Sequence, residues 1–192
     1  MHRILGRLLA ASLAVTGLII GLIATSASAA PAPAPAAGQT KSADAASPAI
    51  ALTDGIVVTI KNAYSNKCLD DYGFSTDDGN AIVQHTCNGY ENQKWVAVAV
   101  PNTNFEVFYF RNKYSGLYLD DYAFSRDDGN IIRQYHYDGY ANQRWHAVGG
   151  FIQNIYSGLF LDDYAFSVNE DDPVRQYHYT GYQNQQWIFS YG

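Results

Sequence analysis

The sequence has little that could build a metal centre or bind nucleic acid. Its 192 residues include only two cysteines, Cys68 and Cys87, so no second cysteine pair exists to complete a zinc site. Basic residues are also few, with 12 Lys and Arg against 18 Asp and Glu and no basic stripe. A net acidic chain of this kind argues against nucleic acid and anionic membrane as partners.

Common enzyme motifs are missing as well. There is no nucleophile elbow, no phosphate-binding loop and no recognisable Ser-His-Asp set. Aromatic residues are abundant instead, with 16 Tyr, 9 Phe and 3 Trp. Helix formers are scarce outside the N-terminal region, while Tyr, Val, Ile, Phe, Gly and Asn dominate. This composition favours short strands and turns.

The first 29 residues have the order of a secretory signal peptide. Arg3 and Arg7 precede an apolar or small stretch over residues 8–24, and ASA at 27–29 fits a small-residue cleavage site. The apolar stretch is long for a signal, so an uncleaved membrane anchor is the competing interpretation. We expect cleavage after Ala29, which would leave a secreted, extracellular protein with no inserted segment.

A linker and one folded domain follow. Residues 30–53 are rich in Ala, Pro and Ser without periodicity, which predicts a linker. Residues 54–192 suit a single domain with one core. Removing the signal removes two of the 12 basic residues and no acids, so the mature charge is 10 − 18 = −8. In an oxidising compartment the two cysteines are expected to form a disulfide.

One unit is written three times in the folded part. LDDYGFS begins at Leu69, and LDDYAFS begins at Leu119 and at Leu161. From each of these leucines to the Gln of a Q-x-W motif the step is 24 residues (93 − 69, 143 − 119 and 185 − 161). The repeats cover about residues 54–98, 99–148 and 149–192, with a longer hairpin around 101–104.

Each unit predicts four short strands separated by turn clusters. In the first unit they centre on 57–60, 67–70, 81–85 and 93–98. Four strands at this period also fit a propeller blade, but a propeller needs at least about four blades to close. Three units instead predict an all-β threefold barrel whose hairpins cap one end.

The motifs QKW, QRW and QQW, with CLD…QHTCNGYENQKW in the first unit, resemble the ricin-type β-trefoil lectin family, in its secreted bacterial form, over residues 54–192. The resemblance implies a β-trefoil of three four-stranded repeats with pseudo-threefold symmetry. It places Cys68 and Cys87 where the family has a disulfide within one repeat. Aromatic pairs are expected to replace this bond elsewhere, namely Tyr118 with Tyr137 in the second repeat and Phe160 with Tyr179 in the third.

The chemical groups of a shallow sugar site recur in every unit. A carboxylate accepts hydrogen bonds from hydroxyls, an aromatic ring covers the apolar face of a sugar, and an amide both donates and accepts. The resemblance assigns the sugar-binding Asp, the stacking aromatic and an Asn-Gln pair to Asp70, His85, Asn92 and Gln93, to Asp120, Tyr135, Asn142 and Gln143, and to Asp162, Tyr177, Asn184 and Gln185. Two departures stand out: His85 replaces Tyr, and NEDDP replaces DDGN in the third unit, which predicts a reshaped turn.

The paired aspartates argue for binding rather than catalysis. Neighbouring residues in an extended segment point to opposite faces, so Asp120 and Asp121 cannot form a facing acid–base pair. A retaining glycosidase needs two carboxyls about 5 Å apart, and one such pair suffices. The second Asp of each pair is expected to cap a turn; these residues are Asp71, Asp121 and Asp163.

Several residues have structural alternatives. Trp95, Trp145 and Trp187 are expected in the core, and the Gln two residues before each can serve only to bond backbone. Tyr90, Tyr140 and Tyr182 either line the sites or cover the hairpins. The DDGN stretch at 77–80 lacks the spaced acidic ligands of a calcium loop, so we expect no metal and no cofactor.

The sequence thus predicts a secreted lectin that binds glycans or polysaccharides at up to three equivalent sites and is not an enzyme. One alternative is a carbohydrate-binding accessory of a glycoside hydrolase system. Another is a trefoil scaffold that binds or inhibits proteins without binding sugar. Retention of Asp, aromatic and Asn in all units speaks against the scaffold, although the fold alone does not decide. The sugar and the oligomeric state are left open.

Overall fold

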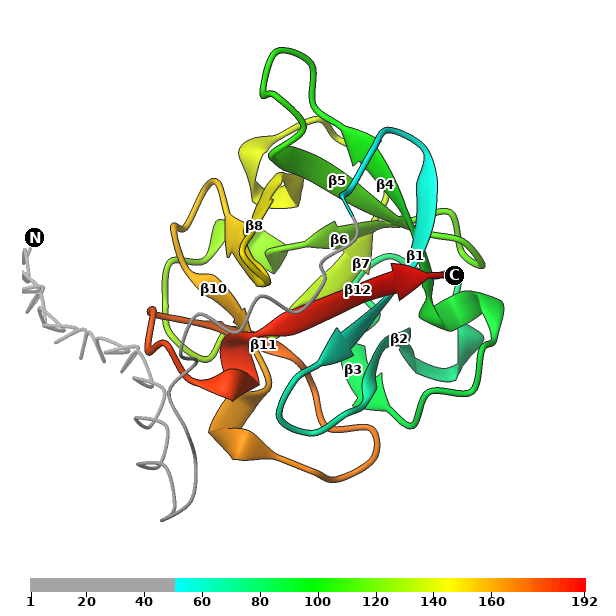
Figure 1. Ribbon diagram of the computed structural model, residues 1–192, viewed down its shortest axis with the longest axis vertical. Helices are drawn as coiled ribbons and strands as arrows, with labels where there is room; N and C mark the ends of the chain where they lie inside the picture. Colours follow the sequence, from blue (N-terminus) through cyan, green and yellow to red (C-terminus); the bar gives the residue numbers. More distant parts are fainter. Residues whose placement is uncertain (1–50) are drawn as a thin grey trace, which may run out of the picture.

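The computed structural model describes residues 51–192; the expected signal peptide (1–29) and residues 30–50 of the expected linker lie outside them. Twelve strands form three groups of four within this part (Figure 1). The groups are β1 (Ile56–Asn62), β2 (Cys68–Asp71), β3 (Ile82–His85) and β4 (Lys94–Ala99); β5 (Val107–Asn112), β6 (Tyr118–Asp120), β7 (Arg133–Tyr135) and β8 (Trp145–Val148); and β9 (Phe151–Asn154), β10 (Phe160–Asp162), β11 (Arg175–Tyr177) and β12 (Trp187–Tyr191).

Short 3-10 turns are the only helices among these residues, and none could span a membrane. One kind follows each LDD stretch: η1 (Tyr72–Phe74), η3 (Tyr122–Phe124) and η5 (Tyr164–Phe166). The other kind carries the Asn-Gln pair: η2 (Glu91–Gln93), η4 (Ala141–Gln143) and η6 (Gln183–Gln185).

Six strands make a closed barrel. Antiparallel pairing runs β12–β1–β4–β5–β8–β9. The Trp187 backbone N–H donates to Gly150 O over 2.7 Å, which joins β12 to the residue before β9 and closes the ring. The C-terminal strand lies beside β1 (Figure 1), where Gly192 N donates to Val57 O at 3.0 Å. The predicted longer hairpin is the β4–β5 connection.

The three remaining hairpins, β2–β3, β6–β7 and β10–β11, meet in a ring of backbone hydrogen bonds. Ile82 N donates to Ile132 O over 3.0 Å, and Ile132 N donates to Val174 O over 3.0 Å. Val174 N donates in turn to Ile82 O over 2.9 Å, which completes the ring. Each hairpin therefore donates to one neighbour and accepts from the other. The predicted all-β trefoil with pseudo-threefold symmetry is confirmed.

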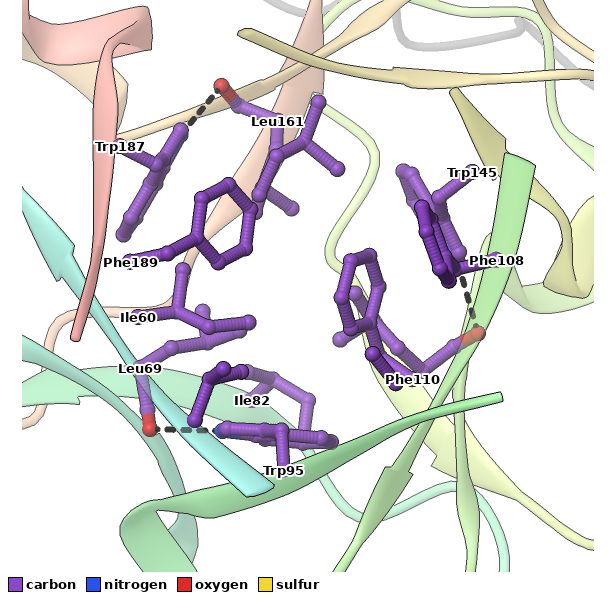
Figure 2. Close-up of a cluster of buried hydrophobic side chains, with 14 of the residues drawn as sticks. Ile60, Leu69, Ile82, Trp95, Phe108, Phe110, Trp145, Leu161, Trp187 and Phe189 are labelled. Carbon is purple, nitrogen blue, oxygen red and sulfur yellow. Dashed lines mark hydrogen bonds between the residues drawn. The ribbon is translucent and has the colours of Figure 1, made fainter. Parts of the chain in front are cut away.

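The three tryptophans form the core with Phe108, Phe110 and Phe189, as expected (Figure 2). Each is at most 1% exposed, and a buried indole N–H needs an acceptor. The acceptor is the carbonyl of the Leu that begins LDD: Leu69 for Trp95 at 3.1 Å, Leu119 for Trp145 at 2.9 Å and Leu161 for Trp187 at 3.0 Å. This bond explains why the distance from LDD to Q-x-W is constant.

The expected disulfide joins Cys68 to Cys87, with the two Cα atoms 5.1 Å apart. Aromatic pairs occupy the same place in the other repeats. The Tyr118 and Tyr137 rings lie 5.2 Å apart, and the Phe160 and Tyr179 rings 5.1 Å apart. The prediction that aromatic packing replaces the covalent bond is confirmed.

The expected reshaping of the third turn is wrong. The step from Ser to Arg is 8 in the second and third units (133 − 125 and 175 − 167), so NEDDP is a substitution without an insertion. Asp171 takes the left-handed conformation of the glycine that it replaces, with φ 61° against 83° at Gly129. Asp171 N donates to Gln84 O at 2.9 Å, as Gly129 N does to Gln176 O at 2.8 Å. Asp tolerates this conformation better than most residues, which preserves the turn.

Candidate functional site

In each repeat two amides hold the first carboxylate of the LDD stretch, which is buried at or near the end of a short strand. In the second repeat Asp120 ends β6 and is 2% exposed. Asn142 Nδ2 donates to Asp120 Oδ2 over 3.0 Å, and Gln143 bonds the same carboxylate. The other repeats are alike, with Asn92 Nδ2 to Asp70 Oδ1 at 2.9 Å, Gln93 Nε2 to Asp70 Oδ2 at 2.8 Å, and Asn184 Nδ2 to Asp162 Oδ1 at 3.1 Å.

The turn that carries these amides is fixed to the following repeat. Asn142 lies on η4, and its backbone carbonyl accepts Asn154 Nδ2 at 2.7 Å from the end of β9. The same carbonyl accepts Asp121 N at 3.0 Å. Asn112 and Asn62 make the corresponding bonds to Asn92 O and Asn184 O, both at 2.9 Å. Every site is thus built at a boundary between two repeats.

The glutamines act as supports, which corrects their predicted contact with ligand. Gln143 is fully buried; its Nε2 donates to His136 O over 2.7 Å, and its Oε1 accepts Asp138 N over 3.1 Å. An amide whose groups are committed inside the protein has none left for a bound molecule. Gln93 and Gln185 are equally buried and make the same backbone bonds. The backbone-bonding alternative therefore describes the glutamines, with a bond to the carboxylate in addition.

The second aspartate of each pair has a different role from the predicted cap. The 3-10 turns that follow Asp71, Asp121 and Asp163 have no side-chain capping hydrogen bond. Instead Asp121 Oδ1 accepts Asn130 Nδ2 at 3.0 Å, and Asp71 Oδ1 accepts Asn80 Nδ2 at 2.7 Å. These bonds tie the LDDY segment to the DDGN turn of its own repeat.

Burial raises the pKa of all six carboxyls, because the interior disfavours the charged form. The pKa values of Asp70 and Asp120 rise to about 6 and that of Asp162 to about 7, although hydrogen bonds from the amides oppose the rise. Those of Asp71 and Asp121 rise to about 7. Asp163 reaches about 8 through burial and then the charges of Asp162 and Asp172.

A hollow of about 220 Å³ opens over Asp120 in the second repeat. It brings together three predicted residues, Asp120, Tyr135 and Asn142. It also has walls that the sequence-based assignment missed, namely Tyr122, Ala123, Phe124 and Asp138. The signal for three of them was present, because Tyr122, Ala123 and Phe124 belong to the phrase LDDYAFS that recurs in the chain.

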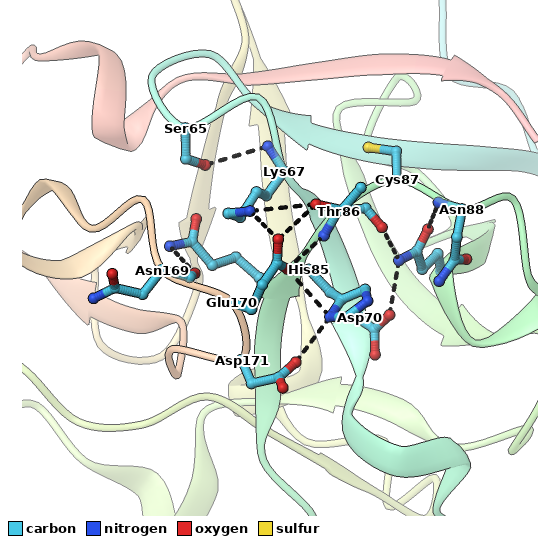
Figure 3. Close-up of polar contacts among 12 residues, drawn as sticks. Ser65, Lys67, Asp70, His85, Thr86, Cys87, Asn88, Asn169, Glu170 and Asp171 are labelled. Carbon is cyan, nitrogen blue, oxygen red and sulfur yellow. Dashed lines mark hydrogen bonds and ion pairs between the residues drawn. The ribbon is translucent and has the colours of Figure 1, made fainter.

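The first repeat places its stacking residue in a different environment. His85 Nδ1 lies 2.9 Å from Asp171 Oδ1 and 3.3 Å from Glu170 Oε2, in a charged cluster that reaches across from the third repeat (Figure 3). Lys67 forms an ion pair with Glu170 in the same cluster. Tyr177 is 6% exposed, whereas Tyr135 is half-buried. The ring contacts of Tyr177 otherwise match those of Tyr135, with Tyr164 at 6.0 Å and Tyr122 at 6.1 Å, so the first repeat is the one that departs from the common plan.

The six-stranded barrel, the ring of three hairpins and the buried carboxylate site in each repeat together define a β-trefoil of the lectin type. A family model described as ricin-type beta-trefoil lectin domain-like matches residues 50–135 and 91–162. The chain therefore belongs to the ricin-type β-trefoil lectin family. A search of curated proteins found no match.

Solved structures agree with this assignment. The designed threefold-symmetric protein ThreeFoil is 31% identical, with a TM-score of 0.65 over 69% of this chain and 96% of that one. The exo-beta-1,3-galactanase 1,3Gal43A of Clostridium thermocellum is 29% identical, with a TM-score of 0.67 over 73% of this chain and 31% of the enzyme. A Macrolepiota procera ricin B-like lectin, solved with lactose, is 18% identical with a TM-score of 0.61 over 73% and 99% of the chains, which supports the fold alone.

Proposed function

We propose that this protein is a non-catalytic lectin with one carbohydrate site in each of its three repeats. The observation that carries the proposal is the hollow of the second repeat, where Asp120, Tyr135 and Asn142 line one small open space. A carboxylate held by amides, beside an aromatic ring, matches what a sugar offers: vicinal hydroxyls on one edge and an apolar face. Membership of a lectin family supports the same conclusion.

Asp120 supplies the directional part of recognition in this proposal. Its two oxygens are positioned before any ligand arrives, because Asn142 and Gln143 bond them and the Asn142 carbonyl is itself bonded by Asn154. A preorganised carboxylate loses little freedom on binding, which favours affinity at a shallow site. Tyr135 then covers the C–H face of the sugar. The glutamine of each repeat maintains the carboxylate without touching the sugar.

The same roles are proposed for the other repeats, with Asp70, His85 and Asn92 in the first and Asp162, Tyr177 and Asn184 in the third. We also propose that residues 1–29 are cleaved as a secretory signal, that 30–53 form the linker and that 54–192 form the lectin domain outside the cell. N-terminal sequencing of the protein from culture medium tests this: a mature chain beginning at Ala30 supports it, and an intact Met1 contradicts it.

A second candidate function is that of a carbohydrate-binding accessory to a glycoside hydrolase. It is favoured by the similarity to the galactanase, which covers 31% of that enzyme's chain and so corresponds to a module of it. In both candidates the domain binds sugar and leaves glycosidic bonds intact, since the buried carboxylates are held by amides rather than poised across a substrate.

A printed glycan array tests the proposal, with an Asp70→Asn, Asp120→Asn, Asp162→Asn triple variant as the matched control. Binding by the natural protein and none by the triple variant is the expected result. Absence of binding by the natural protein would favour the protein-binding scaffold. Release of reducing sugar from a polysaccharide that it binds would identify an enzyme instead.

A further inference from the structure

Three aromatic clusters lie at the repeat boundaries, outside the hydrophobic core. Each contains the Phe of the LDDY phrase, the Tyr before the Asn-Gln turn and a Tyr from the following repeat. In the second repeat Phe124 lies 5.8 Å from Tyr140 and 5.2 Å from Tyr156, both in edge-to-face contact. The other clusters are Phe74 with Tyr90 (5.8 Å) and Tyr114 (5.1 Å), and Phe166 with Tyr182 (5.8 Å) and Tyr64 (5.3 Å). We call each cluster an aromatic shelf.

Most of these rings are open to solvent; Tyr156 is half-buried, with the Arg126 guanidinium 4.6 Å from the centre of its ring. Phe124 is 41% exposed and Tyr140 is 60% exposed, and the shelf of the first repeat is similarly open. Single exposed aromatic residues need no explanation, but grouped ones on a soluble protein mark an interaction surface. The edge-to-face contacts also hold the rings in fixed positions, so little freedom would be lost when a ligand covers them.

Backbone strain accompanies the shelf. Ala123 and Phe124 are both left-handed, with φ 62° and 54°, and Ala165 and Phe166 repeat this at 61° and 55°. Non-glycine residues are strained in this region, and such backbone strain clusters at binding sites. The first repeat places Gly73 before its Phe at φ 67° yet keeps the left-handed Phe74. The strained phenylalanine is thus common to all three repeats.

The shelf is not required to hold the repeats together. The boundary already has a buried bond, from Asn154 Nδ2 to Asn142 O at 2.7 Å. Asn154 Oδ1 also accepts Tyr156 N at 2.9 Å, which fixes the turn through its backbone rather than its ring. The exposed Tyr140 ring adds little to a contact that buried groups already make.

The shelf adjoins the hollow. Phe124 is a wall of the hollow and the centre of the shelf, so one ring belongs to both. Asp138 is another wall of the hollow, and its Oδ1 accepts Tyr140 N at 2.8 Å. This bond fixes the position of the Tyr140 backbone. The hollow and the shelf are therefore continuous through Phe124.

We propose that each aromatic shelf is a second carbohydrate subsite, which takes the sugar unit adjoining the one in the hollow. The inference rests on the lectin function proposed above and specifies its substrate class: oligosaccharide or polysaccharide chains in preference to terminal monosaccharides. Aromatic rings stack on the apolar faces of pyranoses without selecting particular hydroxyls. The hollow then sets specificity for one sugar unit, and the shelf makes the affinity depend on the length of the sugar chain.

The test uses the mature protein with Asp70→Asn and Asp162→Asn, so that only the site of the second repeat is read. It is compared with the same protein carrying Tyr140→Ala and Tyr156→Ala, which lie outside the hollow. The probe is an array of galactose, mannose, rhamnose and xylose, each printed beside its own di- and tetrasaccharides. Titration calorimetry of the tightest pair gives the affinities.

We expect the protein with its natural shelf to bind the tetrasaccharide about tenfold more tightly than the monosaccharide. The double variant should lose most of this ratio, because the rings that would cover the second sugar unit are gone. Tyr191→Ala, at a residue 73% exposed and outside the clusters, is the matched control and should keep the ratio. Tyr140→Leu with Tyr156→Leu keeps apolar bulk without a ring and serves if the alanine variant melts early.

The outcomes separate the two proposals. A tetrasaccharide-to-monosaccharide ratio that survives loss of both tyrosines overturns the shelf and leaves the lectin function intact. An equal fall in affinity for every chain length also overturns the shelf, because it indicates a damaged hollow. No binding of any printed sugar by the natural protein overturns the lectin function and the shelf with it.

Discussion

Asn142 donates to Asp120 across 3.0 Å, and each of these side chains is only 2% exposed. The carboxylate is therefore held by the protein before it meets a ligand. Asp120→Asn keeps the shape but replaces a charged acceptor, and it should weaken sugar binding at the second site by about 1.5–3 kcal/mol. Calorimetry should report two remaining sites of unchanged affinity. Unaltered stoichiometry would falsify the role given to Asp120.

The six raised pKa values predict opposite effects of pH on stability and on binding. An ordinary aspartate has a pKa near 3.8, whereas these rise to between about 6 and about 8. Between about pH 4 and pH 8 the folded protein thus binds more protons than the unfolded chain. The free energy of unfolding must fall as pH rises through this window. The stability that these carboxyls contribute is fully present below their pKa in the unfolded chain, and it is lost as pH rises above their pKa in the folded protein.

Thermal melts at pH 5 and pH 8 check the stability effect, and the higher Tm is expected at pH 5. Glu170, with a pKa lowered to about 2, acts in the opposite direction but only below about pH 4.5. Sugar binding should instead strengthen from pH 5 to pH 8, since it uses the ionised carboxylates. Asp163→Asn removes the highest pKa and should flatten the stability profile between pH 7 and pH 8. A Tm that climbs steadily over the whole range contradicts the assignment.

The third repeat has an aspartate where the others have an asparagine. Asn130 donates to Asp121 over 3.0 Å, but the corresponding Asp172 carries a charge that raises the pKa of Asp163. Asp172→Asn should restore the donor, stabilise the domain by about 0.5–1.5 kcal/mol and lower the Asp163 pKa. Urea unfolding and carboxyl NMR titration are the measurements. Asp127→Asn, an exposed position in the second turn, controls for loss of charge and should leave the Asp163 pKa unchanged.

The disulfide and the tyrosine pair occupy the same position in different repeats, which allows them to be exchanged. Cys68→Ala with Cys87→Ala should cost about 3 kcal/mol of unfolding free energy, as estimated for a short closed loop. Cys68→Tyr with Cys87→Tyr should recover part of this. Full recovery is not expected, because Tyr109 packs against both Tyr118 and Tyr137, while the first repeat has Thr59 at that place. Equal stability of the Ala and Tyr variants in denaturant would show that the ring pair contributes nothing.

Three sites on one rigid body predict avidity. A single shallow site should bind a monosaccharide weakly, near the millimolar scale of about −4 kcal/mol. Simultaneous contacts with a glycan surface can exceed this by about 10²–10⁴-fold. Surface plasmon resonance on immobilised polysaccharide should show stepwise loss as Asp70, Asp120 and Asp162 are replaced by Asn singly, in pairs and together. If one single variant abolishes all binding while the others change nothing, only one site works.

The sequence predicted the fold because its signals are local and repeated. LDD and Q-x-W lie at fixed spacing, and the bond from Trp145 to Leu119 O requires that spacing. The predicted contact between Gln143 and the ligand was wrong for a physical reason. Spacing shows that a residue lies near a site, but it does not show whether a 3-10 turn directs the side-chain amide into the protein. Contacts between repeats were also invisible. Glu170 accepts a hydrogen bond from Thr86 N at 2.8 Å across 84 residues, and Asp78 and Asp128 accept His136 N and His178 N in the same way. The repeat shows that these residues recur, but it does not show which of them pair across a boundary.

The ring formed by Ile82, Ile132 and Val174 makes the repeats interdependent. Each hairpin gives its N–H to one neighbour and its carbonyl to the other, so any two of them alone would leave one donor and one acceptor unmatched in a buried place. The sequence divides into three repeats, but only all three hairpins together satisfy every buried backbone N–H and carbonyl of the ring. A substitution that displaces one hairpin from the ring must therefore also perturb the sites of the other two repeats.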